Sequence, residues 1–168
     1  MKKKGLAAIR RADGADANRA APLVAGFRVE LRRLKGRETA PDVERGREEF
    51  LEYCRAGYPI YLAEVDGACA GYLVCRVDEP VVWVESIYVA PDFRRQGIAS
   101  ALFDQAQAYA AGFGEDTLYN YVHPNNHGMI QFLAKKGYQV LNLVEIRRAY
   151  PGETPTSKVQ VGEHLFDY

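Results

Sequence analysis

The stretch ESIYVAPDFRRQGIASALF, residues 85–103, begins with the composition of a strand and ends with that of a helix. Its first part is rich in β-branched and aromatic residues up to Val89, and its last part spaces apolar residues as an amphipathic helix does. Pro91, two arginines and Gly97 lie between them. No Asp, Ser or Thr caps the free amides at the start of this helix. An anion bound there would replace such a side chain.

The segment RRQGIA has the composition of an anion-binding loop. Gly97 and Ala99 are small enough to let an anion approach the backbone, Ser100 adds a hydroxyl, and Arg94 and Arg95 add positive charge. The loop lacks the Gly-Lys-Ser/Thr ending of a Walker motif and the three glycines of a dinucleotide fingerprint. An ordinary turn is the alternative interpretation.

The rest of the chain predicts one α/β (α+β) domain over residues 1–168, with a core of about residues 6–150. Asp66-Gly67 predicts a hairpin turn between two strands. Alternating hairpins and strand–helix–strand connections predict a mixed, mostly antiparallel central sheet of six to seven strands with about four helices. Helices are expected over 15–34, 41–56, 97–111 and 129–137, and strands over 6–12, 60–65, 68–77, 81–89, 116–122 and 138–150; residues 158–168 add a strand or a tail.

Composition excludes several classes of protein. Lys plus Arg and Asp plus Glu both number 22, which argues against a general nucleic-acid binder. The chain has no apolar stretch near the ~18 residues of a membrane helix. Cys54, Cys69 and Cys75 give no disulfide framework and no zinc pattern, so we expect reduced thiols in a cytoplasmic protein without a metal.

Two motifs together resemble the GNAT-type, acetyl-CoA-dependent N-acetyltransferases. YVAPDFRRQGIASALF resembles the acyl-CoA-binding segment of that family, a strand ending V-x-P followed by R/Q-x-x-G-x-G/A and a helix. NHGMIQFLAKKGY supplies the second signature, with Asn126 and the pair Gly137-Tyr138 at matching spacing. The resemblance extends from about Leu6 to Arg147, and it implies the GNAT fold.

The resemblance also implies a binding site for acetyl-CoA as cosubstrate. The pantetheine arm would lie beside Ile87, Tyr88 and Val89, and the amide of Val89 would face the thioester carbonyl. Asn126 would hold the cofactor arm, or cap the helix that follows it, or do both. The pyrophosphate would lie on the loop formed by Arg94, Arg95, Gln96, Gly97, Ile98, Ala99 and Ser100.

The reaction implied is direct attack of a primary amine on the thioester in a ternary complex, which requires a proton acceptor. Glu85 is the first candidate, because strand alternation would place it on one face with Trp83, Ile87 and Val89. Some polyamine-type members of the family use a glutamate at this offset, four residues before the valine. A salt bridge at the strand rim is the other reading of Glu85, and His123 is the alternative base.

One position departs from the family pattern. Leu133 stands where many members carry a tyrosine that protonates the leaving thiolate. Tyr119, Tyr121 and Tyr138 are possible substitutes, and the sequence does not choose among them. The departure keeps open a second function, a non-catalytic acyl-CoA-binding or regulatory domain of the same fold.

The acceptor is the least specified part of the prediction. A small-molecule or peptide amine is implied, without nucleic acid or membrane, and a homodimer is compatible with the sequence. The acidic residues Glu48, Glu49 and Glu52 either attract a cationic amine or form a solvated helix face. A third hypothesis is an unrelated α/β domain in which RRQGIA is a turn.

Overall fold

The computed structural model describes residues 7–168, so Leu6, the first residue of the predicted strand over 6–12, lies outside it. The chain divides into two compact units, Met1–Ile130 and Gln131–Tyr168. Among the described residues, no helix combines the length and apolar character needed to cross a membrane. The helices are α1 (Ala17–Leu34), α2 (Val43–Arg55), α3 (Ile98–Ala111) and α4 (His127–Lys135), with short 3₁₀ turns η1 (Gly14–Asp16) and η2 (Pro91–Phe93).

The sheet of the first unit has five strands in the order β1-β2-β3-β4-β5. All neighbours are antiparallel except β4 and β5, which are parallel, so the predicted mixed, mostly antiparallel sheet with four helices is confirmed. Asp66 and Gly67 both have positive φ, as the predicted hairpin turn requires. The strands are β1 (Ala8–Arg11), β2 (Ile60–Val65), β3 (Ala68–Asp78), β4 (Val81–Val89) and β5 (Tyr119–Asn120).

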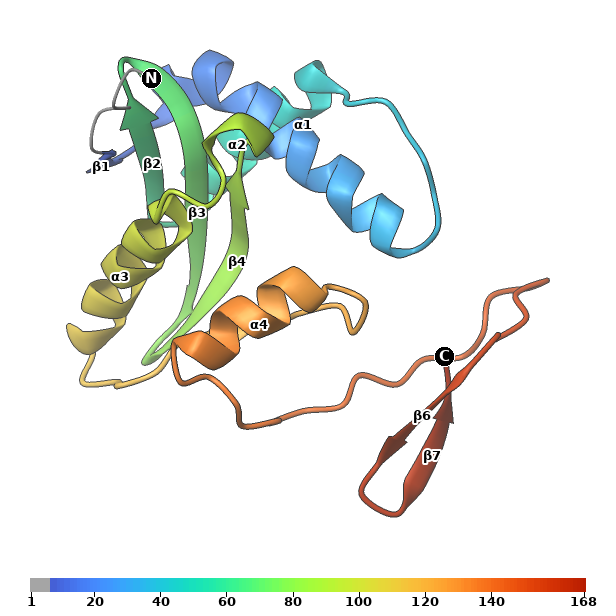
Figure 1. The fold of residues 1–168 in the computed structure, drawn as a ribbon. Coiled ribbons are helices and arrows are strands. Elements are labelled where there is room, and N and C mark those ends of the chain that lie inside the picture. The colour runs from blue at the N-terminus through green and yellow to red at the C-terminus, as the bar shows by residue number, and fades with distance from the viewer. Residues whose placement is uncertain (1–6) are drawn as a thin grey trace. The chain divides into compact units, whose positions relative to one another are not determined.

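Helices cover both faces of this sheet (Figure 1). Helices α1 and α2 enclose a core that includes Val24, Phe50, Tyr72 and Val74, all buried. Helix α3 packs on the opposite face, where a Cβ built on Gly71 would lie 3.4 Å from Leu102. Neighbouring residues on a strand point to opposite faces. Gly71 of β3 therefore faces α3, and the next residue, Tyr72, faces α1 and α2.

Two predicted strands differ from the structure. The strand predicted over 116–122 pairs at Tyr119 and Asn120 alone, and residues 138–150, predicted as a long strand, have no regular secondary structure. Val140 is 91% exposed and Leu141 70% exposed, so this segment has β-branched and apolar residues without a neighbouring strand. Strand propensity reflects packing against neighbouring strands, and the composition of a segment does not show whether such a neighbour is present.

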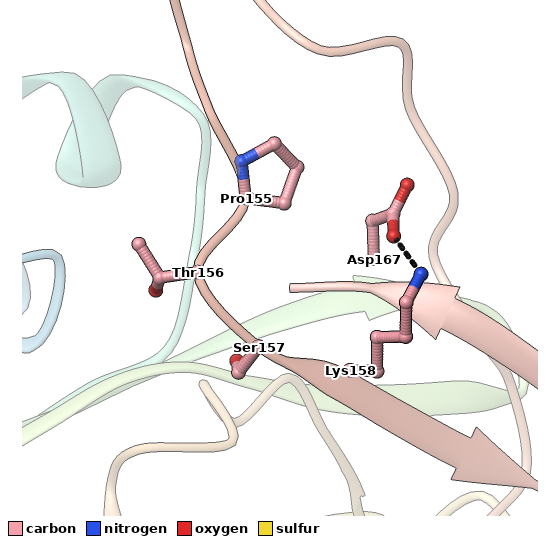
Figure 2. A pocket seen from close by; sticks show the side chains of 5 residues that line it. All are labelled: Pro155, Thr156, Ser157, Lys158 and Asp167. Carbon is pink, nitrogen blue, oxygen red and sulfur yellow. Dashed lines mark hydrogen bonds and ion pairs between the residues drawn. The ribbon is translucent and has the colours of Figure 1, made fainter.

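The second unit contains a separate hairpin, β6 (Lys158–Val161) and β7 (His164–Asp167), in the region predicted as a strand or tail. The backbones of Ser157 and Tyr168 exchange two hydrogen bonds of 2.9 Å at its open end. A shallow pocket beside it is lined by Pro155, Thr156, Ser157, Lys158 and Asp167 (Figure 2). Lys158 and Asp167 pair at 2.6 Å, so the two charges in this pocket neutralise each other.

A partly buried ion pair joins α1 to α2. Arg28 of α1 donates to both carboxylate oxygens of Glu49 in α2, and the hydroxyl of Tyr53 donates to the same carboxylate. Glu49 is therefore not part of a solvated helix face, and its carboxylate is not free to attract a cationic amine. Both interpretations of the acidic residues fail for Glu49. Glu48 does lie at the surface, where it pairs with Arg45 at 3.0 Å.

Close contact between α1 and α2 generates a stability prediction. A Cβ at Gly46 in α2 would lie 2.5 Å from the carbonyl oxygen of Ala21 and 3.0 Å from the amide of Ala25. Because these are backbone atoms, Gly46→Ala must move one helix, and we expect a loss of about 1–3 kcal/mol in the free energy of unfolding. Urea denaturation measures it.

The matched control is Gly128→Ala. Gly128 lies in α4, and a Cβ there meets no heavy atom within 4 Å. We expect this change to leave the protein as stable or slightly more stable, because alanine has the higher helix propensity. Equal stability of the two variants would contradict the tight α1–α2 contact.

Candidate active site

Strand β4 has one fully paired edge and one open edge. It pairs with β3 along its length, whereas within the described residues β5 pairs with it at Trp83 and Val84 alone. The amide of Ala90 donates to a carbonyl of β3 at 2.9 Å. Because successive amides of a strand point to opposite edges, those of Ile87 and Val89 point to the open edge. An extended ligand can pair there as an added strand.

The open edge leads through η2 into an uncapped helix N-terminus (Figure 1). Gly97 is the N-cap residue of α3, with φ 79° and no side-chain cap. Arg95 also has positive φ, at 62°. A Cβ built on Gly97 meets no heavy atom within 4 Å, so the space beside the first-turn amides is open. The loop thus has the shape and polarity that an anionic phosphate needs.

The two arginines of the loop have different surroundings. Arg94 Nε donates to the carbonyl of Val89 at 2.9 Å, and its guanidinium also donates to Glu30 of α1 at 3.2 Å. The same group lies 5.4 Å from the ring centroid of Tyr88. Arg94 therefore fixes the loop to β4 and α1, while the exposed Arg95 is the better placed of the two to meet an anion.

A β-bulge interrupts β4 in its middle. Val74 of β3 lies opposite Ser86, but the next residue, Cys75, lies opposite Val84. Glu85 is the extra residue between them and has no partner of its own in this register. A bulge of this kind bends the strand and redirects a side chain.

The bulge makes one sequence prediction wrong. Glu85 was predicted to share a face with Trp83, Ile87 and Val89. The β3 partners of Trp83 and Ile87 are an odd number of residues apart, so these two side chains lie on opposite faces. Simple alternation fails because the bulge adds one residue between them.

Glu85 lies with Arg76 and Trp83 on the face covered by α1 and α2. Its carboxylate is 3.8 Å from a guanidinium nitrogen of Arg76, whose guanidinium lies 5.3 Å from the Trp83 ring centroid. The ring of Tyr121 stacks on that of Trp83, with ring centroids 4.6 Å apart and an interplanar angle of 8°. The ring centroid of Tyr119 is 5.0 Å from that of Trp83, at an interplanar angle of 43°. The salt bridge that the sequence allowed for Glu85 is thus present, and its side chain is still 30% exposed.

His123 and Asn126 lie in the turn between β5 and α4. Nδ1 of His123 accepts a hydrogen bond from the amide of Asn125 at 3.2 Å, and the side chain of Asn125 donates to the carbonyl of Leu34 at 3.0 Å. Burial, and then the nearby Lys35, lower the pKa of His123 below its usual value. Asn126 Oδ1 accepts from the amide of Met129 at 3.1 Å, so Asn126 does cap α4.

The sequence did not identify Arg76 as a site residue. Arg76 lies near Glu85 because it is the β3 partner of Trp83, which shares a face with Glu85, and the local sequence does not specify this pairing. Asn120 was also missed: its Oδ1 is buried without a hydrogen-bond partner where β4 and β5 separate. Leu133, at the position of the family tyrosine, is buried in α4.

Comparisons with known proteins show what the sequence and the fold are similar to. An uncharacterised N-acetyltransferase of Methanocaldococcus jannaschii is 29% identical over 92 residues, which cover 51% of this chain and 41% of that protein. The chain thus spans less than half the length of this relative. A solved aminoglycoside N-acetyltransferase, AAC(6')-Iy in complex with CoA, has a TM-score of 0.68 at 19% identity, covering 89% of this chain and 98% of its own.

A ribosomal-protein-alanine N-acetyltransferase from Brucella melitensis biovar Abortus 2308 has a TM-score of 0.65 at 20% identity, covering 86% and 100% of the two chains. At such identities these structures show a common fold. The family model described as "Acetyltransferase (GNAT) family" matches residues 28–138, which include β4, the loop and α3. The chain therefore belongs to the GNAT acetyltransferase family.

Proposed function

We propose that this protein is an acetyl-CoA-dependent N-acetyltransferase that transfers the acetyl group directly to a primary amine in a ternary complex. The observation that carries the proposal is the open edge of β4 that continues into the uncapped N-terminus of α3. Acetyl-CoA supplies an activated acetyl group as a thioester. Its extended arm and its pyrophosphate match these two features in order along the chain.

The geometry supports a set of residues that would hold acetyl-CoA. The amides of Ile87 and Val89 point to the open edge, and the loop from Arg95 to Ser100 presents the first-turn amides of α3. An amide aimed at a developing oxyanion contributes roughly 3 kcal/mol to transition-state stabilisation, and Val89 is our candidate. Asn120 adds an unpartnered acceptor at the point where the strands separate.

Direct transfer is supported by the state of the cysteines. Burial raises the pKa of the Cys75 thiol to about 12, and burial likewise raises the pKa values of Cys54 and Cys69. The thiolate is the nucleophilic form of cysteine, and at neutral pH it is scarce at all three. An acyl-cysteine intermediate is therefore disfavoured.

Glu85 is our candidate proton acceptor. The bulge places its carboxylate beside Arg76 with part of the side chain open to water, which suits removal of a proton from an ammonium group through a water molecule. His123 remains the alternative, because its lowered pKa favours the neutral imidazole at pH 7, although Nδ1 already accepts from the amide of Asn125 and would have to give up that bond to take a proton.

A non-catalytic acyl-CoA-binding domain is the second candidate function. The observation that favours it is Leu133, a buried apolar residue where the family pattern has a tyrosine acid. A thiolate is a tolerable leaving group because thiol pKa values are near ~8.5, so this acid is helpful rather than required.

A turnover screen distinguishes the N-acetyltransferase from the non-catalytic acyl-CoA-binding domain. We expect release of free thiol from acetyl-CoA to increase with one class in a panel of polyamines, aminoglycosides, amino acids and peptide N-termini. With both substrates varied, direct transfer predicts intersecting double-reciprocal lines. Tight binding of CoA without turnover of any amine would leave the binding domain as the function.

The loop assignment predicts the effect of Gly97→Glu. A carboxylate there places negative charge at the phosphate position, and we expect at least a hundredfold loss of acetyl-CoA affinity by calorimetry. Gly57→Glu is the matched control, because Gly57 also has positive φ and open space beside it. The control carries the same backbone strain, so equal affinity in the two folded variants would refute the loop assignment.

The base assignment predicts the effect of Glu85→Gln. The change keeps the size of the side chain and removes its basicity, so we expect kcat/KM to fall by about 100-fold. The loss should be greatest at low pH, where more of the amine is protonated, and acetyl-CoA affinity should be unchanged. A pH–rate profile of Glu85→Gln beside His123→Asn decides which residue is the base, because only the true base shows this pattern.

A further inference from the structure

An aromatic cluster on β4 and at the end of β5 contains Tyr119 and Tyr121, two of the tyrosines that the sequence offers as substitutes for the missing acid. It consists of Trp83, Tyr119 and Tyr121, next to Glu85 and Arg76. Tyr121 uses one ring face to stack on Trp83, and it is 61% exposed, so its other face is open to solvent. Exposed large aromatic side chains of this kind commonly mark a binding surface.

The cluster lies where β4 and β5 begin to separate. Trp83 and Tyr119 are opposite each other in the last paired part of the two strands, and Glu85 follows directly in the bulge. The β3 partners of Val89 and Trp83 are five residues apart, or about 17 Å along an extended strand. The phosphate loop and the aromatic cluster thus occupy opposite ends of the open edge, with Glu85 between them.

The charges near the cluster favour a cation. Arg76 is the positive group, and it is flanked by Glu85 at 3.8 Å and by Asp78 at 3.4 Å. Two carboxylates against one guanidinium leave a net negative charge. An aromatic ring face attracts cations through its quadrupole, so the open face of Tyr121 adds to this preference.

We propose that the acceptor is a small polycationic amine, with one non-reacting ammonium group over the open ring face of Tyr121 and the reacting amine beside Glu85. This inference rests on the proposed N-acetyltransferase function. Amino acids and acidic peptides would be disfavoured, because their carboxylates meet a negative surface and gain nothing from the ring. Tyr121 is in this view a specificity-determining residue, and Trp83 positions it by stacking.

Three amines of equal chain length test the proposal. In 1,5-diaminopentane, pentylamine and 5-aminopentanoate the reacting group is the same, and the far end is cationic, neutral or anionic. We expect KM to be lowest for the diamine and highest for the amino acid. Tyr121→Leu keeps an apolar side chain but removes the ring, and it should raise KM for the diamine by about two- to fivefold while changing KM for pentylamine little.

Two further variants control this comparison. Tyr121→Phe retains the ring and should keep the preference for the diamine. Tyr150→Ala removes a tyrosine of the second unit that is 63% exposed and is not a member of the cluster, and it should leave all three KM values unchanged. Equal KM values for the three amines in the parent protein, with turnover intact, would overturn the polycation proposal and leave the N-acetyltransferase function standing.

A binding measurement separates this proposal from the enzymatic one. Trp83 is the single tryptophan of the chain, so intrinsic fluorescence reports on the cluster without a label. In the presence of CoA, 1,5-diaminopentane should change this fluorescence in the parent protein and at higher concentration in Tyr121→Leu, and 5-aminopentanoate should not change it. Such binding without any turnover would refute the proposed catalysis and support the site, whereas no fluorescence response to the diamine would overturn the site.

Discussion

The unequal pairing of β4 is the constraint on which the rest of the site depends. An unpaired strand edge is a liability for a soluble protein, because its free amides and carbonyls can template aggregation. Here the open part is short, and its carbonyl at Val89 is already bound by Arg94. What remains open is a few backbone donors next to a helix N-terminus, an arrangement suited to a ligand that is extended at one end and anionic at the other.

The bulge at Glu85 determines which face of the sheet the following side chains of β4 lie on. Val84 and Ile87 point toward the α3 layer, while Trp83, Glu85 and Ser86 lie on the α1–α2 side. Alternation from Trp83 already places Glu85 on the face of Arg76, because Trp83 and Arg76 are partners. The extra residue therefore adds Ser86 and Tyr88 to that face and turns Ile87 and Val89 toward the α3 layer.

Local sequence predicted the elements whose signals are local. The hairpin at Asp66-Gly67, strands β2 to β4 and the loop at Gly97 follow from turn chemistry, strand composition and missing caps, and the structure agrees. The faces of Ile87 and Val89 depend on register across two strands. The burial of Glu49 depends on Arg28, 21 residues earlier in the chain. Residues 138–150 have strand-like composition, but whether a strand forms depends on a neighbour that composition does not specify.

The two ends of the open edge carry opposite electrostatic character. At the α3 end, first-turn amides and Arg95 favour an anion, and at the β5 end, Glu85, Asp78 and the ring of Tyr121 favour a cation. For the proposed reaction, this asymmetry would attract a negatively charged cosubstrate to one end and a cationic acceptor to the other, so each would be disfavoured in the other's place. The thioester at the Val89 amide and the amine beside Glu85 would then meet between the two ends.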